Sequence, residues 1–375
     1  MGSSRQIPAL IKQAARNAGF DLAGIAPVRD FPELDHFPAW IAAGRAGEMK
    51  YMEARDEAGH LKRASLRSAV PWARSVIVCA INYNTAEPYS TEVHDSRRGW
   101  ISRYAWGHED YHEVVMRRLR TVESRLREEL LRESAEYPVP STGNESADHY
   151  PLSTHRLQTR CYVDTGPLVE RIYAKYAGVG WIGKNTCILN QNLGSWLFLG
   201  VILTSLELKP DLPPPDRCGT CTRCIDACPT DALIAPYQLD SNRCISYLTI
   251  EKRGTIAEEI WEGMGWHVFG CDICQDVCPW NRKAPATTAP EFQPRESLVN
   301  PALEWLAEMS AEEFREKFRG SPIRRTKRSG LRRNAVVAMG NSRDRRFMPV
   351  LEKLVEDEDP VVAEHARWAK RKLHT

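Results

Sequence analysis

The chain has 375 residues, of which 42% are hydrophobic and 27% are charged. This composition is typical of globular proteins, and the length exceeds what one core usually holds, so we expect two or three domains. The formal net charge is only +2, which excludes a uniformly basic or acidic protein and leaves its partners open. The longest apolar run, residues 196–203, is far shorter than a membrane-spanning helix. No secretory signal is recognisable, so we expect a cytoplasmic protein without membrane segments.

The first half of the chain alternates predicted helices with predicted strands. Apolar residues recur at helical spacing from Ile7 to Ala18, and Gly19 is a suitable stop. This alternation predicts an α/β domain over residues 1–208. Residues 137–156, rich in proline, serine and asparagine, favour a surface loop or an insertion. The other expected elements are a strand at 74–83, a helix at 111–134, a strand end at 161–164, a helix at 165–178 and one or two strands at 194–208.

Two proline-rich stretches, 209–217 and 283–294, separate the cysteine-rich part of the chain from its neighbours. We therefore expect a cysteine-rich domain at 209–290 and a third domain at 291–375. Helical patterns continue to the end of the chain, and two similar short segments lie about thirty residues apart, close to one repeat period. The third domain is therefore predicted to consist of HEAT-like helical repeats, with helices near 330–341, 346–360 and 361–373.

The spacing of the cysteines carries the strongest chemical signal. The first run follows C-x2-C-x2-C-x3-C-P, the bacterial ferredoxin pattern in which the fourth cysteine ligates the other cluster. The second run lacks one cysteine, which Cys244 can supply. Applying the crossing rule, one [4Fe-4S] cluster takes Cys218, Cys221, Cys224 and Cys278, and the other takes Cys228, Cys244, Cys271 and Cys274. Paired CxxC motifs also form structural zinc sites, which is the main alternative. Cys79, Cys161 and Cys187 stand apart in apolar surroundings and are expected to be buried small hydrophobes.

Two close clusters form an electron path, and the acceptor should lie in the first domain. No G-x-G-x-x-G or Walker A motif follows its strands, so a nucleotide site is unsupported. CYVDTGPLVERIYAKYAGVGWIGKN (161–185), GSWLFLGVILT (194–204) and the two cysteine runs resemble the epoxyqueuosine reductase family over essentially the whole chain. The resemblance implies a cobalamin-dependent iron–sulfur enzyme related to reductive dehalogenases. It also implies the last step of queuosine biosynthesis, reduction of epoxyqueuosine to queuosine in the tRNA anticodon loop.

The resemblance further assigns roles to residues of the first two domains. Asp164 matches the family's proposed general acid, and its apolar strand end should keep it protonated; the alternative is a helix N-cap. Tyr104 is either an assistant in proton delivery or a core tyrosine. The sequence departs from the family around His108 and His112, whose roles are therefore open. The cobalamin contacts implied by the resemblance are Arg63, Asp164, Lys184, Asn185, Ile188 and Ser246, and no D-x-H-x-x-G motif supplies an axial histidine.

The basic residues gather near the end of the chain. Between residues 321 and 346, nine lysines and arginines face a single acid, Asp344, a clustering expected at a phosphate-binding surface. Together with the resemblance, this predicts a tRNA partner, an external low-potential electron donor and a monomeric enzyme. The alternatives are a corrinoid reductase of a small molecule and a zinc-stabilised RNA-binding scaffold. The basic residues are Arg324, Arg325, Lys327, Arg328, Arg332, Arg333, Arg343, Arg345 and Arg346.

Overall fold

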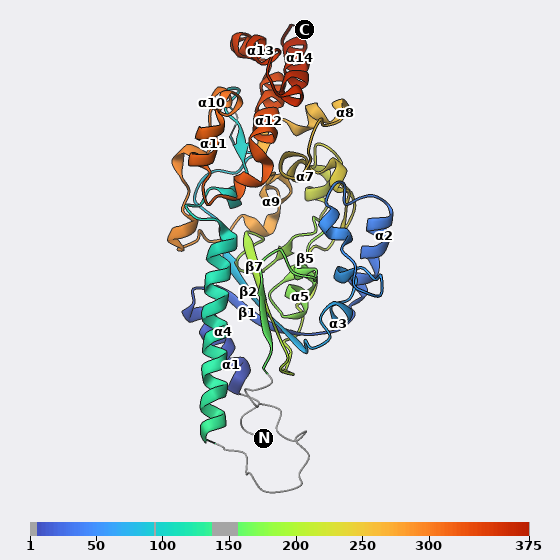
Figure 1. Cartoon of the computed structure of the whole chain (residues 1–375), viewed down its shortest axis with the longest axis vertical. Coiled ribbons are helices and arrows are strands. Elements are labelled where there is room, and N and C mark those ends of the chain that lie inside the picture. Colours follow the sequence, from blue (N-terminus) through green and yellow to red (C-terminus); the bar gives the residue numbers. More distant parts are fainter. Residues whose placement is uncertain (1–5, 94, 137–156, 375) are drawn as a thin grey trace.

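A computed structural model of the chain describes residues 6–93, 95–136 and 157–374. The predicted loop at 137–156 lies outside the described residues. Figure 1 shows a sheet domain at one end, the helical C-terminal region at the other, and the cysteine segments between them. No helix in the described ranges combines the length and the apolar character needed to cross a membrane.

A four-stranded sheet organises the first domain, in the order β1 (Leu22–Pro27), β2 (Ser75–Asn82), β7 (Leu197–Thr204) and β4 (Thr159–Tyr162). Every neighbouring pair is antiparallel. The alternation of helices and strands therefore does not produce the parallel sheet usual in α/β domains. Long connections between the strands return the chain so that each strand runs in the opposite direction to its neighbours in the sheet.

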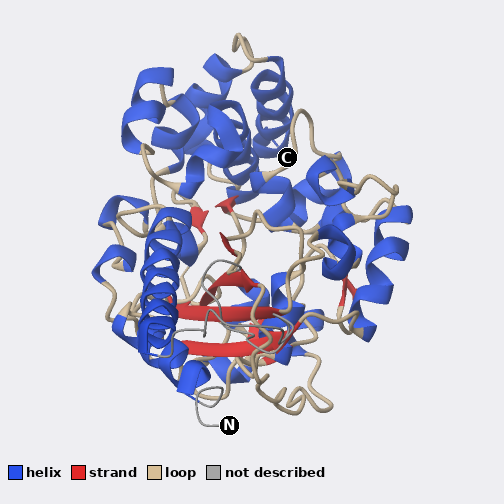
Figure 2. Cartoon of the chain, turned by 60° about the horizontal axis from the view of Figure 1, so that its bottom comes forward, coloured by secondary structure: helices blue, strands red, loops and turns tan. Residues whose placement is uncertain are grey.

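Both faces of the sheet are covered, which explains why β2 is an unbroken apolar run. The side chains of Ile77, Cys79 and Ile81 enter the core beneath α1 (Gln6–Asn17) and α4 (Tyr111–Glu136). Those of Val76, Val78 and Ala80 enter the core beneath α5 (Glu170–Tyr176) and α3 (Leu66–Ala69). Figure 2 shows the strands lying between these helical layers.

Gly24 of β1 allows the end of α5 to approach the sheet closely. A Cβ atom at this position would lie 1.8 Å from the carbonyl oxygen of Ala177, so no larger residue fits there without displacing backbone. The predicted helix stops also hold, since Gly19 and Gly178 both have positive φ angles.

The cysteine-rich segment is built from short elements that carry the cysteines in turns. Two one-turn helices, α6 (Arg223–Asp226) and α9 (Ile273–Asp276), pack against each other. The segment's other elements are β8 (Leu233–Ala235), β9 (Gln238–Leu239), α7 (Ile245–Ile250), α8 (Glu258–Trp261) and β10 (His267–Phe269). The first domain contributes α2 (His36–Ala42) and the hairpin of β5 (Trp181–Ile182) and β6 (Ile188–Leu189).

The segments expected as separate domains share cores. Strand β3 (Trp100–Ile101) leaves the first domain and pairs with β10 in parallel. Its two residues lie in one core with α7 and the C-terminal helices. Conversely, Ala289 and Phe292 pack into the core beneath α4. The interleaving holds the cysteine loops against the sheet domain.

The C-terminal helices lie close to their predicted positions. They are α10 (Leu303–Glu308), α11 (Ala311–Lys317), α12 (Lys327–Ser342), α13 (Met348–Leu354) and α14 (Pro360–His374). Helix α12 is central, because it packs against α14, α10, β10 and α7. Its residues 330–340 are all buried, so α12 has no solvent-facing stripe along most of its length.

Candidate active site and cysteine loops

Asp164 lies in a tight turn directly after β4. Its φ angle is +57°, a left-handed conformation that non-glycine residues rarely adopt. The N–H of Thr165 donates to the carbonyl oxygen of Val163 at 2.7 Å. The N–H of Asp164 donates to Oε1 of Glu170, in the first turn of α5, at 2.9 Å. These two hydrogen bonds hold the strained backbone that presents the carboxyl group.

The Asp164 carboxyl group is not desolvated in the free chain. Its side chain is 47% exposed, so the expected burial of this carboxyl group is wrong. The phenolic O–H of Tyr111 donates to Oδ2, and Nε2 of His112 lies 3.6 Å from the same oxygen.

Glu170 is the neutral partner of this carboxylate. Burial raises its pKa well above the ordinary value, and the negative charge of Asp164 raises it further. Its side chain is enclosed beneath the turn. A protonated Glu170 accepts the Asp164 N–H without adding a second negative charge to the site.

Tyr111 takes the place that the sequence suggested for Tyr104. Burial raises the pKa values of both phenols far above 10, so both retain their protons. The ring of Tyr104 packs edge-on against Tyr111 at 5.8 Å, whereas the tyrosine that donates to the Asp164 carboxyl is Tyr111. The sequence analysis did not single out Tyr111 and Glu170, and it left the role of His112 open; the signal for Tyr111 and His112 was a cluster of polar and aromatic residues, DYH, at a predicted helix start.

Arg63 joins Asp164 as expected, and Tyr51 connects it to the C-terminal region. Arg63 donates from Nη2 to the carbonyl oxygen of Asp164 at 3.4 Å and from Nη1 to that of Tyr51 at 2.9 Å. Arg325, in the 3-10 turn η13 (Pro322–Thr326), donates to the Tyr51 hydroxyl at 3.1 Å and pairs with Glu251. The basic C-terminal segment therefore reaches the site.

The first predicted set of cluster ligands is brought together. Burial and the neighbouring thiols of Cys218 and Cys221 raise the pKa of Cys224. Burial raises the pKa of Cys278 to about 11, and Cys218 and Cys224 add to it. Cys278 also packs with Trp181 and Leu189. Cys278, from the second cysteine run, therefore lies beside Cys218 and Cys224 of the first run.

The second predicted set lies deeper. Burial raises the pKa of Cys271 well above 9, followed by the effects of Cys244 and Cys228. A hydrogen bond with Cys187 and burial raise the pKa of Cys274, and the neighbouring thiols of Cys271 and Cys244 raise it further. Among the described residues, no three His, Cys, Asp or Glu side chains converge closely enough to hold a single metal ion.

Cys187 does not stand apart in apolar surroundings, as the sequence suggested. Its thiol makes a hydrogen bond with Cys274, and this bond is the main reason that the Cys187 pKa is lowered. The interpretation as a buried small hydrophobe holds for Cys79, which is fully enclosed. Cys161 is only half-buried and contacts the Glu123 carboxylate.

The remaining cobalamin candidates lie along the cysteine loops. Lys184 donates to the carbonyl oxygens of Gly219 and Cys221 at 2.7 and 3.0 Å. Asn185 is buried and donates to the carbonyl oxygen of Cys274 at 3.2 Å. Ile188 lies in the core of the first domain. The half-buried hydroxyl of Ser246 makes no hydrogen bond within the described parts of the chain, which leaves it available to a ligand.

Aromatic side chains join the second thiol set to the Asp164 site. Gly270, which precedes Cys271, lies against Tyr104: a Cβ atom there would be 3.5 Å from the ring. Tyr104 contacts Tyr111, and Tyr111 bonds Asp164. The Asp164 turn and the deeper thiol set are therefore connected through the rings of Tyr104 and Tyr111.

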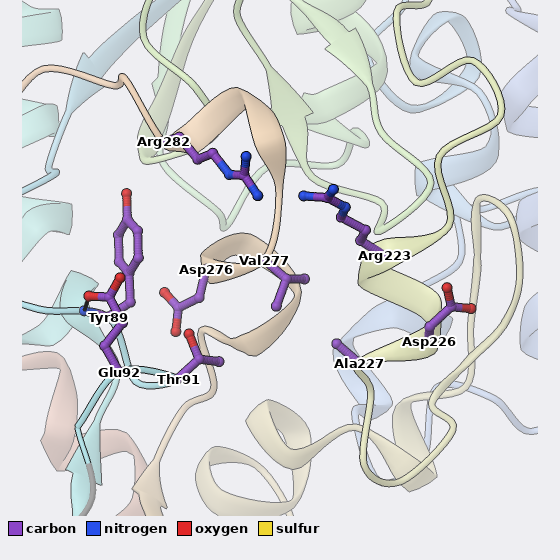
Figure 3. A pocket seen from close by; sticks show the side chains of 9 residues that line it. All are labelled: Tyr89, Thr91, Glu92, Arg223, Asp226, Ala227, Asp276, Val277 and Arg282. Atoms are coloured by element: carbon purple, nitrogen blue, oxygen red, sulfur yellow. Dashed lines mark hydrogen bonds between the residues drawn. The ribbon is translucent and has the colours of Figure 1, made fainter.

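A separate hollow lies on the outer side of α6 and α9. It has a volume of about 540 Å³, and Figure 3 shows Arg223 and Arg282 pointing into it from opposite sides. Burial raises the pKa of its lining residue Asp276 to about 7, and Ser90 donates its N–H to that carboxyl at 2.9 Å. Asp164 does not line this hollow, so it is not the reacting site.

Two arginines of the predicted basic surface are structural. Arg332 is 4% exposed and pairs with Asp357, and its Nε donates to the carbonyl oxygen of Ala307 at 2.7 Å. Arg333 is 1% exposed and donates to the carbonyl oxygens of Leu248, Lys252 and Gly254. These bonds fasten α12 to its neighbours, so a nine-residue phosphate-binding surface that includes them is wrong. Arg324, Arg325, Lys327, Arg343, Arg345 and Arg346 remain exposed.

Comparisons with known proteins agree with this architecture. A family model described as a 4Fe-4S double cluster binding domain matches residues 217–281. A second, described as Epoxyqueuosine reductase QueG, DUF1730, matches residues 63–141. The first match supports two iron–sulfur clusters in the cysteine segment.

Several relatives are similar over nearly the whole chain. An epoxyqueuosine reductase of Xanthomonas campestris pv. campestris is 37% identical, covering 96% of this chain and 94% of the relative. One from Synechocystis sp. is 41% identical over 83% of this chain and 98% of the relative. A crystal structure of epoxyqueuosine reductase with an epoxyqueuosine-modified tRNA-Tyr stem loop covers 100% of this chain and 92% of its own, with a TM-score of 0.84 and 30% identity.

A Bacillus subtilis epoxyqueuosine reductase, described with its catalytic aspartate loop swung out of the active site, gives a TM-score of 0.81 at 29% identity. It covers 99% of this chain and 91% of its own. The extent and identity of these matches, with the cysteine framework and the Asp164 turn, establish the family. The chain belongs to the epoxyqueuosine reductases.

Proposed function

We propose that this protein reduces epoxyqueuosine in tRNA to queuosine, the last step of queuosine biosynthesis. The observation that carries this proposal is family membership over nearly the entire length. The structural match to an epoxyqueuosine reductase with a modified tRNA stem loop supports tRNA as the substrate.

The chemistry needs electrons and protons together. Removing an epoxide oxygen as water consumes two electrons and two protons. Two [4Fe-4S] clusters, held by the two sets of four cysteines, would pass electrons singly from an external low-potential donor. The deeper set lies toward the Asp164 site, so electrons would leave from the cluster of Cys228, Cys244, Cys271 and Cys274. Asp164 would give a proton to the departing oxygen.

The cofactor that we propose for this reaction is cobalamin. When bound, its cobalt supplies the low-potential nucleophile or electron carrier that meets the substrate. The donors with spare capacity are the Arg63 guanidinium, the Ser246 hydroxyl and the third N–H of Lys184, all suited to corrin amides or phosphate. Asn185 and Ile188 would act indirectly, because their side chains are committed to a cysteine loop and to the core.

The exposed basic residues are the proposed tRNA contacts. Arg324 makes no ion pair among the described residues and is adjacent to Arg325, which reaches the site through Tyr51. Charge at this position would draw the phosphates of an anticodon stem-loop toward Asp164. We also propose the division into 1–208, 209–290 and 291–375, a HEAT-like character for the last part, a monomeric state and a cytoplasmic location.

Charge reversal should separate the exposed arginine from the buried one. Arg324→Glu should weaken tRNA binding and reduce the slope of log affinity against log salt by about 1 or more, because a phosphate contact is lost. Arg332→Glu should instead lower the thermal midpoint by many degrees, because breaking a buried ion pair costs about 3–5 kcal/mol. Filter binding across a salt series and thermal unfolding test this pair. A destabilised Arg324→Glu, or an equally stable Arg332→Glu, would contradict it.

The decisive test of function is a reconstituted reaction. Anaerobically purified protein, cobalamin, a low-potential reductant and tRNA carrying epoxyqueuosine should yield queuosine on nucleoside analysis. Omitting cobalamin should abolish the product and leave the iron content unchanged. Absence of product with protein that contains both clusters and cobalamin would refute the proposed function.

A further inference from the structure

This inference rests on the proposed function and concerns the source of its protons. Each turnover needs two protons, but Asp164 can hold only one. Its carboxyl group is 47% exposed and accepts a hydrogen bond from Tyr111. A neighbouring group must therefore protonate Asp164 and be recharged from solvent.

Within the described residues, Arg63 donates to the backbone carbonyl of Asp164, and the other titratable side chains in contact with Asp164 are Tyr111, Glu170 and His112. Only one of these three suits this task. Tyr111 is buried and its pKa is raised far above 10, so it keeps its proton as a fixed donor. Glu170 is neutral but 8% exposed, so it has no direct access to water for renewal. His112 is 29% exposed and therefore contacts both solvent and the site.

Asp110 orients the imidazole of His112 at the start of α4. Its Oδ1 lies 2.8 Å from Nδ1 of His112 and also accepts that residue's backbone N–H at 3.0 Å. An acceptor at Nδ1 assigns that nitrogen a proton and turns Nε2 toward Asp164. Burial alone would raise the pKa of Asp110, but the hydrogen bonds from His112 hold it below the ordinary value. Asp110 therefore remains a charged acceptor.

The distance between donor and acceptor fits proton transfer. His112 Nε2 lies 3.6 Å from Asp164 Oδ2, slightly beyond a hydrogen bond, and such catalytic contacts commonly tighten when substrate binds. The imidazole ring lies 4.1 Å from the ring of Tyr111, tilted by 31°. This packing restricts the ring, so closure requires only a small shift.

We propose that His112 takes protons from solvent and passes them to Asp164, with Asp110 holding the imidazole in the required orientation. Asp164 donates a proton to the oxygen as its bond to carbon breaks, and protonated His112 then restores that proton through Nε2. Neutral His112 takes its next proton from water. Two such cycles, with two electrons from the iron–sulfur clusters, convert the epoxide to a carbon–carbon double bond and water. His112 thus acts on the reaction through Asp164: it restores the proton that Asp164 donates to the oxygen.

The charged groups around His112 and Asp164 determine how this proton transfer depends on pH. Asp110 and Asp164 flank His112, and the positive charge of Arg325 acts on Asp110 from the C-terminal segment. Glu170 and Arg63 contact Asp164 from the other side, and Tyr111 faces both. Neutralising Asp110 should therefore make protonated His112 harder to form, so that the rate falls at a lower pH.

Single-turnover reduction of epoxyqueuosine tRNA by the cluster-reduced, cobalamin-loaded enzyme provides the kinetic test. His112→Gln should lower the rate about 10²-fold or more, with tRNA affinity and iron content unchanged. In Asp110→Asn the alkaline limb of the pH–rate profile should move to lower pH. Imidazole in the buffer should partly restore His112→Ala. The matched control is His108→Gln, because the His108 side chain is exposed and makes no hydrogen bond or ion pair with the described residues; it should react at the wild-type rate.

A measurement without turnover tests the coupling itself. Histidine labelled at Cε1 reports protonation by NMR in the oxidised, cobalamin-loaded protein, and His112→Gln identifies the relevant signal. Its titration midpoint should fall in Asp110→Asn and in Asp164→Asn, and stay constant in Asp226→Asn. A wild-type rate in His112→Gln, or a midpoint insensitive to Asp164, would overturn the inference. Failure of the wild-type enzyme to form queuosine would refute the proposed function, whereas the NMR result would still decide the coupling.

Discussion

Replacing Asp164 by Asn should lower the single-turnover rate of epoxide reduction by about 10²–10⁴-fold. An amide has nearly the same shape and still accepts the Tyr111 hydrogen bond, but it cannot donate an acidic proton to the departing oxygen. The backbone turn should survive, because it depends on the Asp164 N–H and Glu170 rather than on the replaced oxygen.

The comparison is informative only if the cofactors remain bound. Asp164→Asn should retain wild-type iron content, cobalamin affinity and tRNA affinity, with the loss confined to the chemical step. Asp226→Asn, at an exposed position beside the outer hollow, provides an aspartate control that should react normally. Near-normal turnover by Asp164→Asn would remove it as the acid and leave the turn with a structural role.

Cys228→Ala should remove one cluster and abolish turnover. Although Cys228 is in the first cysteine run, its thiol lies close enough to Cys271 and Cys244 of the deeper set to contribute to their raised pKa values. Two cubanes contain about eight irons, so iron should fall to about four per chain, with loss of the deeper cluster's spectroscopic signal. The cluster of Cys218, Cys221, Cys224 and Cys278 should remain, but its electrons would no longer reach the site.

Cys187→Ala is the matched control for this experiment. The Cys187 thiol contacts Cys274, so Cys187 lies directly beside the deeper set without being one of its predicted ligands. It should retain about eight irons, on the two-cubane assignment. Loss of a cluster from Cys187→Ala, or retention of both in Cys228→Ala, would mean that the crossed ligand assignment is wrong.

Local sequence patterns anticipated much of the fold. The helix expected at 111–134 is α4, and the strands expected at 74–83 and 194–208 are β2 and β7. These predictions succeeded because periodicity, propensity and stop residues act over a few turns of chain. The pairing direction of the strands depends on where long connections return, so the antiparallel sheet was not foreseeable from the same patterns.

Charge clustering was the least reliable guide. Arg332 and Arg333 belong to a basic run, yet backbone carbonyl oxygens from residues 248, 252, 254 and 307 and the Asp357 carboxylate surround them. Sequence distance conceals those partners, which come from segments up to 85 residues away. Only the packing of α12 distinguishes a buried structural arginine from the exposed Arg324.

The sequence by itself determined the cysteine framework and the position of Asp164, because ligand spacing and a short motif are local properties. Only the tertiary structure brought Tyr111, His112 and Glu170 around the carboxyl group, placed Cys187 beside Cys274 and left Asp164 open to solvent. Those contacts join a strand end to two different helix starts, and no spacing rule spans them. Their convergence decides which groups can hold or pass a proton, since protonation depends on burial and on neighbouring charge.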